Sequence, residues 1–95
     1  MEQDLYENVV LTTRKILSGE SNVLFVSHDS DDGIWQCLDG ELVREEDACI
    51  ISFEEMVDID KTIHQIRDLP LGFCAYRTDI AREWTIKKNR EIEVR

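Results

Sequence analysis

The sequence predicts a single α+β domain with an antiparallel or mixed sheet of four or five strands. Three observations lead to this fold class. The chain has 95 residues, which suits one hydrophobic core. Short β-rich runs alternate with helical runs along the chain, and turn residues separate them. No repeat, linker or low-complexity segment divides it, so residues 1–95 are expected to form one domain.

The first 38 residues predict a helix followed by a β-hairpin. Residues 4–17 carry apolar side chains near one stripe at helical spacing, with Asp4 as a suitable N-cap. The runs "NVLFVSH" (22–28) and "GIWQCL" (33–38) are short and rich in β-formers. The short polar link between them is typical of a hairpin turn.

The middle of the chain predicts a strand and two short helices. "ACIISF" (48–53) has the composition of a strand, and Ser52 with Glu55 has the spacing of a capping box. A helix is therefore expected to begin at Phe53. Because Asp60 is itself a good N-cap, we expect a break there and a second short helix after it.

The last third predicts two more strands. Pro70 and Gly72 end the helical run, "FCAYR" returns as a strand, and "EWTIKK" (83–88) is expected as an edge strand. Residues 89–95 alternate charge without a core pattern, so a mobile tail is expected. The N-terminal and middle helices are expected to pack on one face of the sheet.

The charge is strongly acidic and unevenly distributed. The net charge is −10; residues 1–60 hold 16 acidic and 3 basic residues, whereas residues 61–95 hold 5 and 8. Nucleic acid is not expected as a partner, because phosphate binding needs a basic footprint. An acidic face of this kind steers a basic protein partner, or it serves solubility alone.

The segment composition predicts a cytoplasmic protein. No window approaches the ~18 consecutive apolar residues of a membrane span, and the start "MEQDLYENVV" is acidic where a secretory signal is basic. Cys37, Cys49 and Cys74 are odd in number, lack C-x-x-C spacing and lie in apolar segments. We expect them to be reduced and buried.

The acidic stretch "HDSDDG" (28–33) is the first candidate site. Asp29, Asp31, Asp32 and Gly33 resemble the start of a calcium loop, but a count from Asp29 puts the glycine fifth instead of sixth. Turn chemistry and a functional polar surface both remain open as interpretations.

Enzymatic and metal-binding alternatives centre on His28. A carboxylate beside it favours a proton carrier, but Ser27 and Ser30 lack the glycines of a nucleophile elbow. Zinc would need His28 together with the three cysteines, whose spacing is not that of a zinc site. His64 is expected to pack or to lie on the surface. We expect no metal and no cofactor, with a small enzyme or ligand-binding domain using the His28/Asp29/Asp31/Asp32 loop as the alternative function.

The two tryptophans are either core residues or anchors for a partner. An indole ring suits both, provided that its N–H finds an acceptor. Together with the acidic segments they complete the candidate binding surface, which comprises His28, Asp29, Asp31, Asp32, Trp35, Asp39, Glu41 and Trp84.

Two segments, "DDGIWQCLDGE" and "CIISFEEMVDIDKTIHQIRDLPLGFCAYR", carry a family resemblance. They resemble a family of small bacterial domains of unknown function grouped with the immunity-protein-like domains of polymorphic toxin systems. The matching features are Gly33 and Trp35, Gly40 and Glu41, residues 52–59, Asp60, Pro70 and Gly72, and Tyr76 with Arg77. The resemblance implies an α+β fold and a binding rather than catalytic role. The expected function is a protein-binding module that occludes a toxin or another basic partner.

Overall fold

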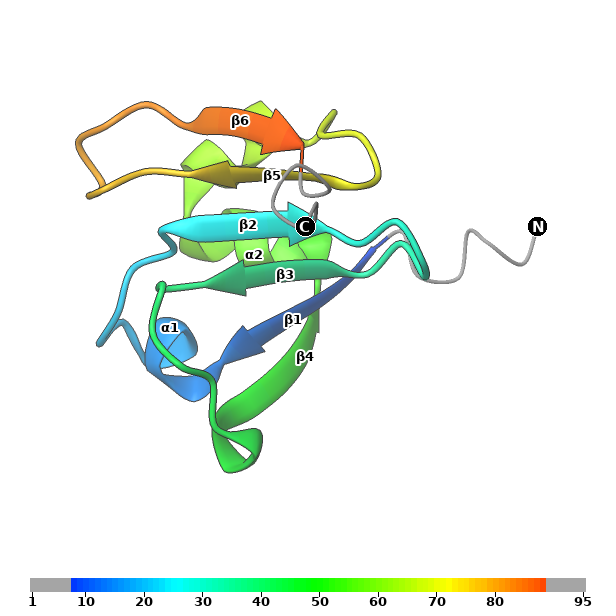
Figure 1. Cartoon of the computed structure of the whole chain (residues 1–95). Coiled ribbons are helices and arrows are strands. Elements are labelled where there is room, and N and C mark those ends of the chain that lie inside the picture. The colour runs from blue at the N-terminus through cyan, green and yellow to red at the C-terminus, as the bar shows by residue number, and fades with distance from the viewer. Residues whose placement is uncertain (1–7, 89–95) are drawn as a thin grey trace.

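Six strands form one mixed sheet in the computed structural model, which describes residues 8–88 (Figure 1). The order is β4-β1-β3-β2-β5-β6, and neighbours are antiparallel except β1 and β3, which are parallel. The α+β class is confirmed, but the sheet has six strands instead of four or five. The strands are β1 (Val9–Thr13), β2 (Phe25–His28), β3 (Trp35–Leu38), β4 (Ala48–Ser52), β5 (Phe73–Tyr76) and β6 (Thr85–Lys88).

Strand β1 lies in a segment for which the sequence predicts a helix. That prediction is wrong for Val9–Thr13, and the helix α1 is limited to Arg14–Ser18. β-Branched side chains make up most of "VVLTT", and they lose χ1 freedom in a helix but pack well in a strand. Pairing with both β3 and β4 then outweighs the helical spacing of the apolar residues. Thr13 caps the helix that follows, because its hydroxyl accepts a hydrogen bond from the Ile16 N–H.

Two expectations fall outside the described residues. These are the N-cap at Asp4 and the mobile tail at 89–95. Within residues 8–88, no helix is both long enough and apolar enough to cross a membrane.

The centre of the sheet is the predicted hairpin of β2 and β3. Its register runs from the pair Phe25 and Leu38 to the pair His28 and Trp35. The residues between the strands, 29–34, are called the β2–β3 turn below. β5 pairs with the other side of β2, and the Gly72 N–H donates to the His28 carbonyl at 2.7 Å. The end of β2 is therefore held from both sides.

Helix α2 (Phe53–Ile59) begins at the predicted capping box. The Ser52 hydroxyl accepts from the Glu55 N–H at 3.1 Å, and the Glu55 carboxylate accepts from the Ser52 N–H at 2.8 Å. Asp60 then ends α2 and caps η3 (Lys61–Ile66), which is a 3₁₀ helix. The predicted pair of short helices is confirmed. A further 3₁₀ turn, η2 (Glu45–Asp47), precedes β4.

The core lies between one face of the sheet and the middle helices. Figure 1 shows α2 behind the strands. Buried residues from both layers, with Ile16 from α1, form one cluster that includes Val10, Val26, Trp35, Ala75, Phe53, Met56, Ile63 and Ile66. Cys37 and Cys74 are buried as expected, whereas Cys49 is half-buried. Burial raises the pKa of Cys37, with a smaller contribution from the Asp60 charge, to about 12.

Alternate side chains of the sheet point away from that core. We call this side the open face. Cys74, paired with Ser27 on this side, is buried, but several apolar residues of the face are half-buried or exposed. They are Leu11, Phe25, Leu38, Ile50 and Tyr76. No helix among residues 8–88 lies in front of these strands in Figure 1.

Candidate functional site

The β2–β3 turn is closed by its own acidic residues. Asp29 accepts from the Gly33 N–H through its carbonyl at 2.9 Å and from the Asp31 N–H through its carboxylate at 2.7 Å. The Asp32 carboxylate accepts from the Ile34 N–H at 3.0 Å. These are Asx-type turns, in which a short acidic side chain replaces a backbone acceptor. Gly33 has φ +78°, a left-handed conformation that side chains other than glycine rarely adopt.

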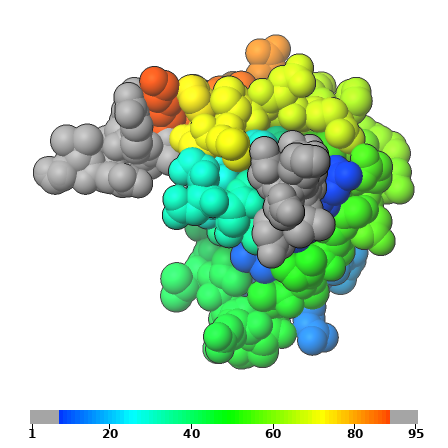
Figure 2. All heavy atoms as spheres, turned by 90° about the vertical axis from the view of Figure 1, so that its right-hand side faces the viewer, coloured from blue at the N-terminus to red at the C-terminus, as the bar shows by residue number. Residues whose placement is uncertain are grey.

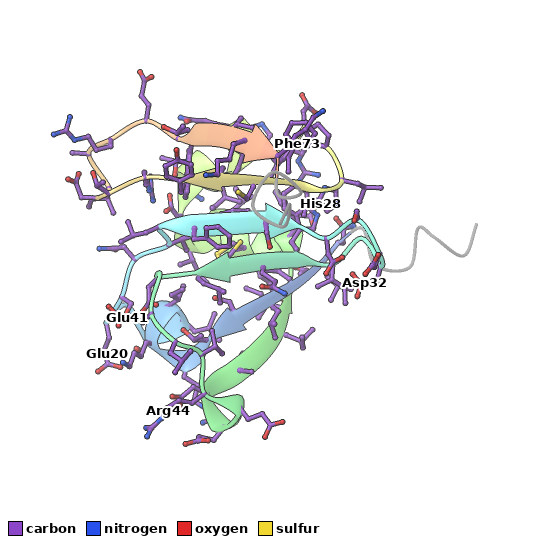
Figure 3. All side chains as sticks on the ribbon, in the orientation of Figure 1. Glu20, His28, Asp32, Glu41, Arg44 and Phe73 are labelled. Atoms are coloured by element: carbon purple, nitrogen blue, oxygen red, sulfur yellow. The ribbon has the colours of Figure 1, made fainter. Side chains whose placement is uncertain are left out.

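The hydrogen bonds of the turn therefore explain why aspartate occurs at positions 29 and 32. The carboxylates of the turn nevertheless lie near the solvent. Asp31 and Asp32 are exposed and Asp29 is half-buried. Figure 3 shows Asp32 at the tip of the hairpin. Figure 2 shows this end of the molecule, with the cyan atoms of the turn beside the yellow segment around residues 70–72. A Cβ on Gly72 would lie 3.5 Å from Cβ of Ser30, so the two segments are in close contact.

His28 is held by groups other than the loop carboxylates. Its Nδ1 lies 2.8 Å from the Leu69 carbonyl oxygen. Because a carbonyl only accepts, Nδ1 carries the hydrogen. The ring stacks on Trp35 with centroids 3.9 Å apart and planes 13° apart. Nε2 is buried and has no hydrogen-bond partner among residues 8–88. His28 is close to the aspartates in sequence, but within residues 8–88 it forms no ion pair or hydrogen bond with an aspartate side chain.

A row of rings continues from His28 into the helical layer. Trp35 meets Phe53 edge-to-face at 4.8 Å, and the Arg67 guanidinium lies over the Phe53 ring at 4.6 Å. These four residues and Asn8 line a cavity of about 270 Å³. Trp35 has only 3% of its surface exposed, so it supports the turn from below and does not belong to the exposed surface.

The second acidic segment lies at the opposite end of β3. The Asp39 carboxylate accepts from the Glu41 N–H at 2.9 Å. Burial acts to raise the pKa of Asp39, but hydrogen bonds from Glu41 and Ser21 and the charge of Lys15 outweigh it, so the pKa lies below its ordinary value. Figure 3 shows Glu41 and Asp32 on opposite sides of the molecule. One contact surface centred on the turn does not reach both segments.

Trp84 belongs to a third location, around a buried arginine. The Arg77 guanidinium lies over the Trp84 ring at 4.1 Å and pairs with Asp60 at 2.7 Å. It also donates twice to the Val23 carbonyl. The Thr62 hydroxyl accepts from Arg77 at 3.1 Å and from the Trp84 indole at 3.3 Å, and it donates to Asp60 at 2.7 Å. We call Asp60, Thr62, Arg77 and Trp84 the Arg77 cluster.

Sequence reasoning did not identify the Arg77 cluster as a unit. Asp60 and Thr62 lie at the start of η3, Arg77 directly follows β5 and Trp84 directly precedes β6. No spacing pattern relates them. Asp60, Thr62 and Arg77 border a cavity of about 370 Å³. Its rim includes the exposed side chains of Ile59 and Ile80. The sequence did indicate that Asp60 is suited to cap a helix. That role explains only the hydrogen bond that Asp60 accepts from the Thr62 N–H.

The candidate surface therefore separates into three places. His28, Asp29, Asp31 and Asp32 lie together at one end of the central hairpin, Asp39 and Glu41 lie at the other, and Trp84 packs in the Arg77 cluster. Among the described residues, no group of three or more His, Cys, Asp or Glu side chains is arranged to hold a metal ion. His64 is exposed, so of its two expected roles the surface one applies.

No family model, curated protein or solved structure matches this chain.

Proposed function

We propose that the chain is a protein-binding module that contacts a basic partner through the β2–β3 turn. The observation that carries the proposal is that Asp31 and Asp32 are exposed on a turn whose backbone is already fixed. Four hydrogen bonds hold residues 29–34 in place. A contact surface that is ordered before binding loses little conformational entropy in the complex.

The charge of the whole chain supports the same type of partner. A net charge of −10 creates a long-range field that attracts a positively charged surface. Such a field raises the association rate and adds specificity, while it contributes less to the lifetime of the complex. The acidic turn then acts mainly in the encounter with the partner.

The position of His28 favours this proposal over the enzymatic alternative. A general base needs a nitrogen that reaches a substrate proton. In His28, Nδ1 donates to the Leu69 carbonyl and Nε2 is buried. The turn carboxylates accept bonds from the backbone of the turn itself. This arrangement suits a rigid surface better than a proton relay.

The resemblance to immunity-protein-like domains adds a mode of action to the proposal. A module of this kind inhibits by covering the surface of a toxin, and it needs no chemistry of its own. A basic toxin surface would complement Asp29, Asp31 and Asp32. We therefore propose an immunity-like role in which the acidic turn approaches first and contacts around it complete the complex.

The test uses the purified products of the genes beside the one that encodes this chain. Binding is measured for the wild type and for the triple variant Asp29→Asn, Asp31→Asn, Asp32→Asn. We expect the variant to associate about tenfold more slowly and with a weaker salt dependence, since exposed charges act mainly on the association rate. Asn retains the acceptor oxygen of each turn, so the melting temperature is expected to stay unchanged.

A matched control changes the same number of charges elsewhere. The triple variant Asp58→Asn, Asp68→Asn, Asp79→Asn alters three exposed aspartates outside the turn. It is expected to bind almost as the wild type does. Equal slowing in both triple variants would contradict a role for the turn, and the absence of any binding protein among the neighbouring gene products would contradict the immunity-like role.

A further inference from the structure

The two edges of the sheet differ in a way that bears on binding. In the part of the chain that the structure describes, β4 pairs only with β1, and β6 pairs only with β5. Each edge strand therefore presents backbone N–H and C=O groups that no strand within residues 8–88 takes up. Such groups are a template for another strand, and proteins usually protect them with charged side chains, proline or a bulge.

The β6 edge carries this protection. Lys87 and Lys88 are exposed, and their ammonium groups lie 5.6 Å and 5.8 Å from the ring centroids of Tyr76 and Phe73. Lysine on an edge strand keeps an incoming strand away, because pairing would remove its charge from water. The β6 edge is therefore protected against pairing with another strand.

The β4 edge carries none of these features. Its sequence "ACIIS" has no charge, proline or glycine, and its five residues pair with β1 in regular register from Ala48 to Ser52 without a bulge. Ile50 has 63% of its surface exposed and lies beside Leu11 on the open face. A regular, apolar and β-branched edge is the kind that accepts an added strand.

Acidic residues outnumber basic residues around β4. Near its first end lie the acids Asp39, Glu41, Glu45, Glu46 and Asp47 and the basic residues Arg14, Lys15 and Arg44. Near its second end lie Glu54 and Glu55, and the basic residue there is Arg67, which already pairs with Glu54 at 3.2 Å. A second copy of this chain would bring the same excess of acid to the interface. The charges instead complement a segment with basic ends.

We propose that β4 is a docking edge, and that it takes an extended segment of a protein partner as a seventh strand. The Ala48 N–H already donates to the Glu45 carbonyl and the Ser52 N–H to the Glu55 carboxylate, so the backbone N–H that β4 offers on its outer side is that of Ile50. The segment would hydrogen-bond to the N–H and C=O of Ile50, place apolar side chains beside Ile50 on the open face, and carry basic residues at its ends. This proposal does not use the β2–β3 turn, so it succeeds or fails separately from the function proposed above.

The experiment uses the full chain labelled with ¹⁵N and a defined peptide. The peptide alternates valine and threonine and has a lysine at each end. Amide shifts are expected in residues 48–52 and slowed hydrogen exchange at Ile50, whose N–H points away from β1, with neither change in residues 85–88. Replacing the two lysines by glutamate should weaken binding about tenfold at low salt, and methylating alternate peptide nitrogens should abolish it because the ladder bonds are lost.

A pair of variants separates the edge from general hydrophobic binding. Ile50→Lys gives β4 the protection that β6 already has, so peptide binding is expected to be lost. Ile80→Lys changes an isoleucine of similar exposure, 59%, outside the sheet, and it is expected to leave binding unchanged. Melting temperatures of both variants report whether the fold is retained.

Three results would overturn the proposal. One is that the peptide shifts the amide signals of β6, or signals spread over the open face. Another is that binding survives methylation of the peptide nitrogens. The third is protection of the Ile50 amide that grows with protein concentration in the absence of peptide, which would make a second copy the occupant.

Discussion

Arg77 and Arg67 make the same kinds of contact in two parts of the molecule, yet their surroundings differ. Each guanidinium lies over an aromatic ring, Trp84 or Phe53, and each pairs with a carboxylate. The side chain of Arg77 is 1% exposed and its ion pair measures 2.7 Å, whereas the side chain of Arg67 is 42% exposed and its pair with Glu54 measures 3.2 Å.

The difference shows that burial, and not the type of contact, determines what such a pair contributes. A buried ion pair depends on every one of its hydrogen bonds, because a charge left alone in the interior is strongly unfavourable. An exposed pair competes with water and contributes little to folding. We therefore interpret the Arg77 cluster as a buried network that stabilises the fold, and Arg67 as a surface residue beside the cavity at His28.

Removing the buried arginine tests this comparison most directly. Arg77→Ala leaves Asp60 partly buried without its partner, and we expect the free energy of unfolding to fall by about 3–5 kcal/mol. Chemical denaturation measures the change. Arg82→Ala removes an exposed arginine 3.9 Å from Asp79 and is the matched control, with an expected change of at most ~0.5 kcal/mol. Similar losses in the two variants would contradict the stabilising role of the Arg77 cluster.

The pH dependence of stability reports on the same region through Cys37. Its pKa rises from 9.0 to about 12 in the folded chain, chiefly by burial and further by the charge of Asp60. Above pH 9 the Cys37 thiol ionises in the unfolded chain but stays protonated in the folded chain. The free energy of unfolding therefore falls as the pH rises from 9 towards 12. We expect a loss of several kcal/mol across this range.

The variant Cys37→Ala isolates that effect. Its stability at neutral pH is lower, but the part of the decline due to Cys37 is absent, so its curve between pH 9 and 12 is flatter than that of the wild type. Denaturant titrations at a series of pH values measure both curves. Parallel curves would show that the thiol ionises equally in both states.

Thr62→Val sharpens the comparison within the Arg77 cluster. The change keeps the shape of the side chain and removes the hydroxyl that contacts Asp60, Arg77 and Trp84. We expect a loss of about 1–3 kcal/mol, because the N–H groups of Arg77 and Trp84 lose an acceptor. Thr78→Val, at an exposed position after β5, is the control. Thermal denaturation of the two variants is the measurement, and a neutral Thr62→Val would show that water replaces the hydroxyl.

Arg67→Ala is expected to have the smallest effect. An exposed ion pair and an exposed contact with a ring each contribute about 1 kcal/mol or less, so the free energy of unfolding should fall by at most ~1 kcal/mol. Chemical denaturation under the conditions used for Arg77→Ala gives the comparison. A loss as large as that of Arg77→Ala would mean that Arg67 also holds the core together, and the comparison between the two arginines would fail.

The parts of the fold that depend on neighbouring residues were predictable. Ser52 and Glu55 form their capping box within one turn of helix, and Asp60 caps η3 through the residues that follow it. The β2–β3 turn is also closed by contacts within residues 29–34, so its acidic composition indicated both the hairpin and the candidate surface. The helix predicted over residues 4–17 was wrong for Val9–Thr13, because apolar spacing does not reveal which strands will lie beside a segment.

By itself, the sequence determined the α+β class, the central hairpin, the start of α2 and the acidic character of the surface, because each follows from local chemistry or composition. Only the tertiary structure decided that β1 is an interior strand, that β4 is an open edge and that Arg77 is buried while Arg67 is not. The physical reason is distance along the chain: Arg77 binds Asp60 across 17 residues and the Val23 carbonyl across 54, and such contacts form only after the sheet and helices have packed together.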